Sequence, residues 1–386
     1  MRQSETSALD PARLHRIGSR IDADIEAGRY DGAAIRVAHR GTIVHQGVHG
    51  WAHRGSGRRL QHGDVFVSMS IGKQFTNVLA LDRVERGLLS LDLHIGEVLP
   101  AFATPELRAM TLFHLLTHTS GILAAVPYVP PEVLMDSARL SGFIAGLRPE
   151  SAPGERVNYS IIAAHSVLAE VLRAVDEGRR DFTTMIAQDL FTPLGMIDTS
   201  LGPRADLLDR VCPVVACYRE PGLFVPEELE GLGQLILVPG CEIPAGGFLT
   251  TIDDLHRFAQ MLANGGELEG TRILSPRTID YCARNFTGNK PNGLFDYTRG
   301  FRGWEPWPAN IGIGFFVRGE GLTPGPISNF CSPRTLCGWG AGSSCFWVDR
   351  DNELSFSFLS TGLMEDSHHI QRLQRLGDLV MASMTR

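Results

Sequence analysis

The sequence predicts a mixed α/β fold of the α+β type. One antiparallel sheet is built from both ends of the chain and flanked by helices, and a mainly helical lobe is inserted between them. Two observations predict this fold: strand-like apolar patterns lie towards the two chain ends, and helical periodicity prevails between them. We therefore expect an α/β sheet domain of residues 1–87 and 241–386, with residues 88–240 as the inserted helical domain. A ligand site is expected in a cleft between the two.

The N-terminal part predicts a helix, a hairpin and a second helix. Residues 10–28 carry apolar side chains at helical spacing, and residues 32–41 and 42–52 carry two β patterns joined by a tight turn. Residues 70–86 form a strongly apolar helical pattern that ends at Gly87. The first helix of the chain is expected to cover the sheet together with the last one.

The middle of the chain is punctuated by proline and glycine and predicts four helices, over residues 111–118, 133–147, 161–176 and 182–191. A further helix is expected over residues 250–266. Thr251 and Asp253 are both candidates for its N-cap, because their side-chain oxygens can accept from the free N–H groups of the first turn.

The C-terminal part returns to β patterns, over residues 310–319, 343–351 and 353–362, and then to a closing helix over residues 366–384. Residues 285–309 are rich in Gly, Pro, Asn and Trp, which predicts a long loop of the kind that often lines binding sites. Its aromatic residues either wall a pocket or anchor the loop on the body of the protein; they are Phe301, Trp304 and Trp307.

The composition excludes several classes of protein. Of the 386 residues, 43% are hydrophobic and 20% are charged, which is typical of a chain that buries a core. The formal net charge is −7 and the sequence contains no basic stripe, so neither nucleic acid nor a membrane is expected as a partner. No apolar stretch approaches the roughly 18 residues that a membrane span needs.

The N-terminus and the cysteines indicate a cytoplasmic protein. Residues 1–20 lack the basic-then-apolar pattern of a signal peptide. An odd number of cysteines, seven in this long chain, favours reduced thiols. Their spacing, as in Cys212 and Cys217, does not match that of zinc ligands.

Lysine is almost absent, since only Lys73 and Lys290 among the 36 basic residues are lysines. Arginine stays protonated, whereas a desolvated lysine can lose its proton and act as a base. Ser70 precedes Lys73 by three positions, so the two side chains share one face of the predicted helix. The positive field of the first helical turn favours an alkoxide at Ser70 and a neutral Lys73, which makes the pair a candidate nucleophile and base. The alternative without a catalytic role is that Ser70 caps the helix and Lys73 is a solvated side chain. Lys290 is expected to be a solvated loop lysine.

Six blocks of sequence put this pair in a wider pattern: FVSMSIGKQF, MTLFHLLTHTSGI, PGERVNYS, FTPLGMIDTSL, PAGGFLTTIDDLHRFAQML and GWGAGSSCFWVD. In their order and spacing the chain resembles, from about residue 10 to 384, the serine β-lactamase and penicillin-binding-protein superfamily. The closest resemblance is to its class C-like branch, which includes the class VIII carboxylesterases and related acyltransferases. The resemblance implies the β-lactamase/transpeptidase-like fold.

The resemblance also implies roles for three side chains. Ser70 matches the nucleophile that is acylated, and Lys73 matches the lysine that takes the serine proton. Tyr159 matches the tyrosine that opens the second motif of the family. Its phenol, held near Lys73, shuttles protons during acylation and deacylation.

The third motif of the family corresponds here to Gly338-Trp339-Gly340, followed by Ala341. The resemblance implies that Trp339, Gly340 and Ala341 border the substrate. It also implies an oxyanion hole made by the backbone N–H groups of Ser70 and Ala341, which would stabilise the charge on the acyl carbonyl oxygen.

Two positions depart from the family pattern. The second motif normally reads Tyr-x-Asn, but here it is Tyr159-Ser160-Ile161, and Gly338 stands where the penicillin-recognising enzymes have lysine. These changes remove polar groups that hold a β-lactam or a peptide, and they leave the nucleophile and base in place. The pattern resembles the esterase and acyltransferase branch, so we expect weak or absent β-lactamase activity.

No metal or other cofactor is expected. His114 and His118 are four apart on a predicted helix, but no glutamate follows His114 as in His-Glu-x-x-His. The sequence around Ser70 also lacks the nucleophile elbow of an α/β-hydrolase.

The predicted function is therefore that of a serine carboxylesterase, a hydrolase that cleaves a small-molecule ester through an acyl-enzyme on Ser70. The first alternative is an acyltransferase of a biosynthetic pathway, which passes the same acyl group to another nucleophile. A β-lactamase or D-aminopeptidase and a non-catalytic scaffold of the same fold are further alternatives. The oligomeric state does not follow from the sequence.

Overall fold

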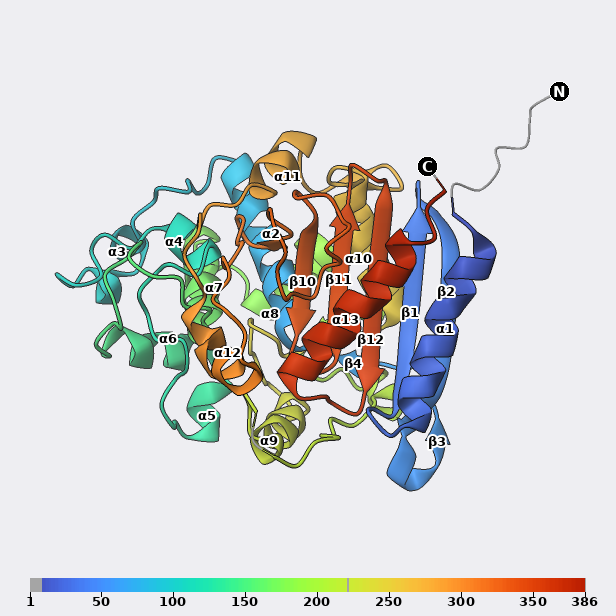
Figure 1. Cartoon of the computed structure of the whole chain (residues 1–386). Helices are drawn as coiled ribbons and strands as arrows, with labels where there is room; N and C mark the ends of the chain where they lie inside the picture. Colours follow the sequence, from blue (N-terminus) through green and yellow to red (C-terminus); the bar gives the residue numbers. More distant parts are fainter. Residues whose placement is uncertain (1–8, 221, 386) are drawn as a thin grey trace.

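The two ends of the chain meet in one sheet of seven strands in the computed structural model, which describes residues 9–220 and 222–385 (Figure 1). The strand order is β3-β2-β1-β12-β11-β10-β9, and every neighbouring pair is antiparallel. The bounds are β1 Gly32–His39, β2 Thr42–His53, β3 Arg58–Arg59, β9 Phe316–Val317, β10 Leu336–Gly340, β11 Ser344–Asp349 and β12 Leu354–Thr361. The predicted fold class is confirmed, because β1 pairs with β12 along its whole length.

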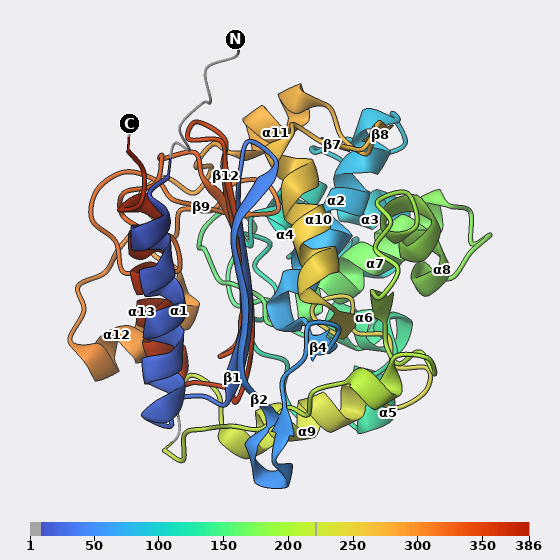
Figure 2. The same ribbon diagram turned by 90° about the vertical axis from the view of Figure 1, so that its right-hand side faces the viewer.

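Helices cover both faces of the sheet. Figure 2 shows α1 (Pro11–Glu26) and α13 (Asp366–Met381) on one face, and α10 (Ile252–Ala263) and α2 (Gly72–Glu85) on the other. The side chain of Asp10 caps α1, and that of Thr251 caps α10, so Thr251 is the N-cap among the two predicted candidates. These four helices confirm the predictions for their segments.

The middle of the chain is helical, as predicted. Its helices are α3 Ile95–Val98, α4 Leu112–Leu116, α5 Pro131–Leu134, α6 Ser137–Ala145, α7 Ala163–Val175, α8 Phe182–Ile186 and α9 Pro226–Ile236. The single helix predicted over residues 133–147 is wrong. Asp136 leaves the helical conformation and its side chain accepts from Ala138 and Arg139, which starts a new helix. The chain continues past α8 as one turn of π-helix over residues 187–191.

Two predictions in the C-terminal part need correction. The β pattern of residues 310–319 yields only β9, because Asn310 and Gly314 adopt left-handed backbone conformations, with φ of 50° and 79°, that interrupt a strand. The long loop predicted over residues 285–309 contains α12 (Asp296–Arg302). Helix α11 (Pro276–Cys282) was not predicted, and neither were α3 and α9 in the middle of the chain.

Short strands complete the fold. Strands β4 (Phe66–Val67), β6 (Phe248–Thr250) and β5 (Ser200–Leu201) form a small sheet, and β7 (Glu267–Leu268) pairs with β8 (Thr271–Arg272). Among the described residues, no helix is long and apolar enough to cross a membrane. Residues 1–8, on which part of the prediction about a signal peptide rests, lie outside the described part of the chain.

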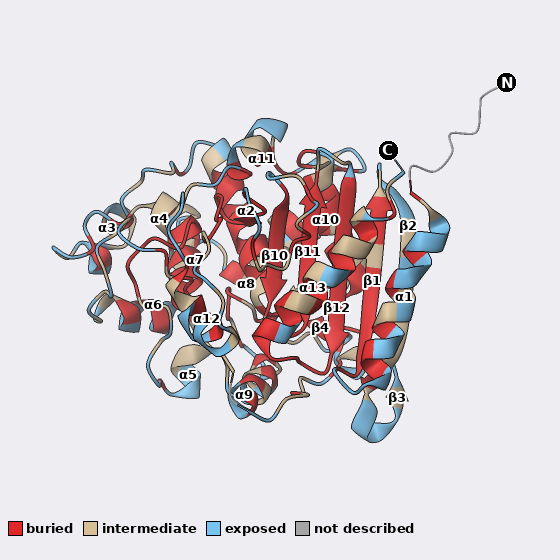
Figure 3. Ribbon diagram, viewed as in Figure 1, coloured by how far each residue is buried: buried red, intermediate tan, exposed pale blue. Residues whose placement is uncertain are grey.

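Helix α2 is buried in the core, between the sheet and the middle helices. Figure 3 shows buried residues concentrated in α2 and in strands β10 to β12. On α2, Phe75 packs edge-to-face against three other rings, those of Phe191, Phe248 and Phe258, at centroid distances of 4.8–5.5 Å. This packing fixes the N-terminus of α2, where the predicted nucleophile lies.

Candidate active site

Ser70 lies in a single 3-10 turn, Met69–Ile71, between β4 and α2. The preceding Met69 has φ of 50°, a left-handed conformation that is strained for a residue with a side chain. Two hydrogen bonds hold the segment: the Ser68 N–H donates to the Phe248 carbonyl at 2.8 Å, and the Ser344 hydroxyl donates to the Ser68 carbonyl at 2.7 Å. The small sheet and β11 thus fix the turn that presents Ser70.

Lys73 lies one helical turn further on, with its side chain buried at 1% exposure. Its Nζ atom is 3.1 Å from Ser70 Oγ, 2.7 Å from the carbonyl oxygen of Ile161 and 3.2 Å from that of Ala245. No carboxylate pairs with Lys73 in the described ranges 9–220 and 222–385, so no opposite charge offsets the cost of burying its own. Burial lowers the pKa of Lys73 to about 7.

These three partners determine how a neutral Lys73 is oriented. A carbonyl oxygen can only accept a hydrogen bond, so the two N–H groups of a neutral amine must donate to Ile161 and Ala245. The lone pair is then left for the third partner, the hydroxyl of Ser70. This is the arrangement of a general base within reach of the proton that it removes.

Tyr159 lies beside this pair, 7% exposed, with the Lys73 Nζ atom 4.9 Å from its ring centroid. Its ring stacks between His118, at 4.3 Å, and Phe316, at 5.5 Å. Burial raises the pKa of Tyr159 well above its usual value, and hydrogen bonding with Ser70 acts in the opposite direction. The phenol is therefore protonated at neutral pH and can pass a proton on.

Two residues for which the sequence indicated no such role hold the backbone at Tyr159 and Ser160. The side-chain oxygen of Asn292 accepts from the Tyr159 N–H at 3.1 Å, and Nδ1 of His118 accepts from the N–H of Ser160 at 3.1 Å. Burial, and then the charge of Lys73, lower the pKa of His118 to about 3, so this ring is neutral. No spacing rule links these residues to Tyr159, because the contacts are made only in the folded chain.

The third motif lies where strand β10 ends against the nucleophile. A Cβ atom on Gly340 would be 2.8 Å from the Ser70 nitrogen and 2.6 Å from the Met69 Cβ, so only glycine lets the strand approach so closely. Ala341 follows Gly340 and lines the same pocket as Ser70. The oxyanion hole itself remains a prediction.

The two departures from the family pattern have structural counterparts. A Cβ atom on Gly338 would lie 2.3 Å from the side-chain oxygen position of Gln74, so Gln74 takes the space into which a lysine would grow. In the orientation that satisfies its hydrogen bonds, the Gln74 amide nitrogen donates to the carbonyls of Ser70 at 3.2 Å and Ile71 at 3.3 Å. At the second motif, Ile161 contributes its carbonyl to Lys73 in place of a side-chain amide.

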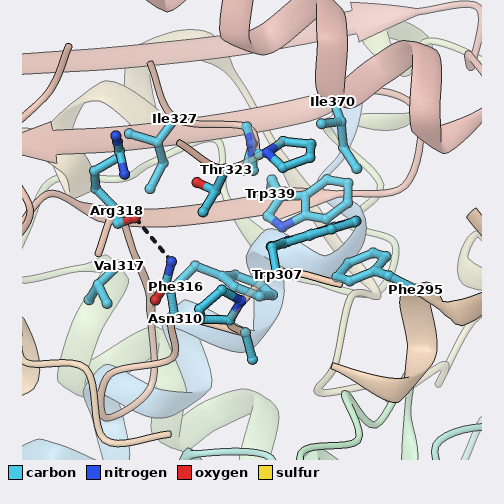
Figure 4. A pocket seen from close by; sticks show the side chains of 15 residues that line it. Phe295, Trp307, Asn310, Phe316, Val317, Arg318, Thr323, Ile327, Trp339 and Ile370 are labelled. Atoms are coloured by element: carbon cyan, nitrogen blue, oxygen red, sulfur yellow. Dashed lines mark hydrogen bonds between the residues drawn. The ribbon is translucent and has the colours of Figure 1, made fainter. Parts of the chain in front are cut away.

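The pocket in front of Ser70 is small and has mostly apolar walls. Its lining residues are Ser70, Tyr159, Leu223, Phe224, Leu294, Phe295, Phe316, Trp339, Ala341 and Asp366. A second hollow adjoins it and shares three of these aromatic residues, which Figure 4 shows together with Trp307.

Of the three aromatic residues of the predicted loop, Trp307 lines the second hollow. Trp304 packs against it, whereas Phe301 is 58% exposed and lines neither hollow.

The paired histidines do not share a helix, which corrects that prediction. Helix α4 ends at Leu116, and His118 lies beyond it with φ of 54°. His114 caps the helix, since its Nδ1 accepts from the Thr111 N–H at 3.1 Å. All seven cysteines have free thiols, and Lys290 is an exposed loop residue that donates to the Gly154 carbonyl.

Comparison with known proteins gives the family. A family profile described as Beta-lactamase matches residues 17–379, so the chain belongs to the β-lactamase family. A curated relative, penicillin-binding protein 4 of Amycolatopsis lactamdurans, is 28% identical over 308 residues, which cover 76% of each chain.

Two solved structures are similar over nearly the whole chain. The crystal structure of a family VIII carboxylesterase has a TM-score of 0.78 at 20% identity and covers 96% of this chain and 97% of that one. EstCE1, described as a hydrolase with promiscuous acyltransferase activity, has a TM-score of 0.75 at 18% identity and covers 96% of this chain and 99% of its own. At these identities the likeness shows the shared β-lactamase/transpeptidase fold.

Proposed function

We propose that this protein is a serine carboxylesterase that cleaves a small-molecule ester through an acyl-enzyme on Ser70. The observation that carries the proposal is the position of Lys73, buried with a pKa of about 7, and hydrogen-bonded to two carbonyl oxygens and to the Ser70 hydroxyl, which can give up a proton. A base with this pKa is matched to proton transfer near neutral pH. The similar family VIII carboxylesterase supports the choice of an ester as substrate.

In the proposed acylation, neutral Lys73 takes the proton of Ser70 as Oγ attacks the ester carbonyl. The N–H groups of Ser70 and Ala341 stabilise the resulting oxyanion. Trp339 and Gly340 border the substrate. The bond to the alcohol then breaks, and the leaving oxygen receives a proton that passes from Lys73 through the Tyr159 hydroxyl. In deacylation, water attacks the acyl-enzyme and gives its proton to Lys73, which returns it to Ser70 as the acid leaves.

The absence of a cation at position 338 supports an ester rather than a β-lactam or peptide carboxylate. Gln74 occupies the space beside Gly338, and its amide is engaged with the backbone of the nucleophile turn. Within the described part of the chain, no arginine or lysine is among the residues that line the pocket in front of Ser70. A substrate carboxylate would therefore find no counter-ion there.

The test is the hydrolysis of p-nitrophenyl butyrate by the wild-type chain and by Ser70→Ala. We expect turnover by the wild type and a loss of at least about a thousandfold in Ser70→Ala. Ser56→Ala, which removes an exposed serine away from the pocket, is the matched control and should retain activity. Equal rates for Ser70→Ala and the wild type would refute the proposal.

Acyl transfer is the second candidate, and the apolar pocket walls favour it. Leu223, Phe224 and Leu294 line the approach to Ser70, and such a surface disfavours water relative to an apolar alcohol as the second nucleophile. Product analysis with and without added 1-butanol separates the two functions. Formation of butyl ester faster than free acid would favour the acyltransferase.

A cytoplasmic location is also proposed, supported by the seven free thiols.

A further inference from the structure

A buried carboxyl group, that of Asp366, lies in the wall of the pocket that contains Ser70. Asp366 is the first residue of α13, directly after the chain leaves β12 and turns back along the sheet, and it is 4% exposed. One hydrogen bond reaches it, from the Gly342 N–H to Oδ1 at 3.2 Å. Among the described residues it forms no ion pair, which is unusual for a carboxyl group so deeply buried.

The charged side chain next to Asp366 adds negative charge and does not neutralise it. Glu365 precedes it, and the ion-pair partner of that neighbouring carboxylate, Arg302, lies 3.9 Å away from it. Arg372 lies further along α13, where Nη2 of its guanidinium donates to the Gly342 carbonyl, Ser360 and His369, and among the described residues it forms no ion pair with Asp366. Burial and the charge of Glu365 raise the pKa of Asp366 to about 7. The ionised carboxylate is thus available near neutral pH and lacks a protein counter-ion.

Aromatic rings surround the space that Asp366 borders. Phe224, Phe295, Phe316 and Trp339 line the same pocket, and Trp339 lies 5.8 Å from Phe295 and 6.1 Å from Phe316, centroid to centroid. Figure 4 shows Phe295, Phe316 and Trp339 from the side of the adjoining hollow. Aromatic faces attract cations, and rings grouped around a carboxylate form a site that suits an ammonium group.

We propose that this pocket selects esters that carry an ammonium group, with Asp366 as its counter-ion. The inference rests on the proposed esterase function and narrows its substrate class. An ammonium group supplies the charge that Asp366 lacks and contacts the aromatic walls, whereas a substrate carboxylate would be repelled. Asp366 is accordingly a specificity-determining residue of the site.

The test compares butyrylcholine with 3,3-dimethylbutyl butyrate, its neutral isostere, in which carbon replaces the ammonium nitrogen. For the wild type we expect kcat/KM to favour butyrylcholine by about tenfold or more. In Asp366→Asn, which keeps an acceptor for the Gly342 N–H, this ratio should fall towards one. Asp351→Asn, at an exposed position after β11, is the matched control and should keep the wild-type ratio.

Binding separates this inference from the proposed function. Calorimetry with the Ser70→Ala chain measures the affinity for the same two esters without turnover, with and without the second substitution Asp366→Asn. A preference for butyrylcholine that Asp366→Asn removes supports the ammonium site, even where the wild type proves to hydrolyse neither ester. Equal affinities for the two esters, or a preference that survives Asp366→Asn, would overturn the inference and leave the esterase proposal standing if both esters are hydrolysed.

The preference should also depend on pH. The charge of butyrylcholine does not change with pH. The ionisation of Lys73 affects kcat/KM for both esters equally, so the ratio of the two values reports on the ionisation of Asp366. The ionisable groups coupled to Asp366 are Glu365 on α13, Tyr159 before α7 and Tyr218 before α9, and the phenols have raised pKa values. We expect the ratio of kcat/KM for butyrylcholine to kcat/KM for the neutral ester to rise between pH 6 and pH 8, because Asp366 ionises around its pKa of about 7. A ratio that does not change over this range would contradict the role of Asp366.

Discussion

The Nζ atom of Lys73 lies 3.1 Å from the Oγ atom of Ser70, and both of its other partners are backbone carbonyl oxygens. Among these three hydrogen-bond partners in the described part of the chain, Ser70 is the one from which the amine can take a proton. This relationship also explains why lysine is kept here in a chain that uses arginine at 34 of its 36 basic positions.

The pH dependence of esterase activity should follow the ionisation of Lys73. The base acts in its neutral form, and burial lowers its pKa from 10.5 to about 7. Activity should therefore be low below pH 6 and rise as the pH increases through about 7. The measurement is kcat/KM for a neutral ester between pH 5 and pH 9. A profile that falls across this interval would show that the protonated lysine is the active form.

Replacing Lys73 by arginine should abolish most activity, by about a hundredfold or more, because arginine does not release its proton. The other lysine of the chain offers a matched control: Lys290→Arg changes an exposed loop residue in the same chemical way. Both variants are assayed for ester turnover, and circular dichroism checks their folding. If a folded Lys73→Arg turned over ester at the rate of Lys290→Arg, Lys73 would have no part in the mechanism.

Removing the hydroxyl of Tyr159 should slow turnover and leave the fold intact. Tyr159→Phe retains a ring that can stack between His118 and Phe316, so thermal unfolding should be close to that of the wild type. The loss of the proton carrier should lower kcat by about a hundredfold. The comparison of kcat with the unfolding midpoint checks both parts. An unchanged kcat would restrict Tyr159 to a packing role.

Gly340→Ala should damage the site directly. The new Cβ atom would meet the Ser70 nitrogen at 2.8 Å and Met69 Cβ at 2.6 Å, which forces β10 and the nucleophile turn apart. We expect kcat/KM to fall by about tenfold or more, since displacements of this size misplace reacting groups. Gly142→Ala, where a Cβ atom meets nothing within 4 Å, is the control. Wild-type turnover by Gly340→Ala would place β10 outside the reacting site.

Hydrolysis of the β-lactam nitrocefin should be much slower than that of an ester, because no cation stands at position 338 and Ile161 offers no side-chain amide. The same enzyme sample is assayed with nitrocefin and with p-nitrophenyl butyrate. Comparable kcat/KM values for the two substrates would mean that the pocket holds β-lactams by other groups.

The sequence predicted those parts of the fold that local pattern determines. The helix that became α1 and the hairpin β1–β2 were found because their periodicity is regular. The strand predicted over residues 310–319 failed because its apolar side chains are buried in an irregular segment, in which Asn310 and Gly314 bend the chain. Alternation of apolar and polar residues alone does not distinguish a regular strand from such a buried irregular segment.

The candidate site divides in the same way. Ser70, Lys73 and Tyr159 stand in short motifs, so their positions were recognisable, and the structure brings them into contact. Asp366 carried no such signal, since its burial depends on how α13 returns over Gly342. Asn292 likewise reaches Tyr159 from 133 positions away in the chain.

The most direct test of the central claim, that Ser70 is the nucleophile, is the intact mass of the protein after reaction with a fluorophosphonate. The wild-type chain should gain the mass of one adduct, and peptide mapping should locate it on Ser70. Ser70→Ala should gain none, and Ser56→Ala should label as the wild type does. Full labelling of Ser70→Ala, or an adduct mapped to another residue, would contradict the assignment of Ser70 as the nucleophile.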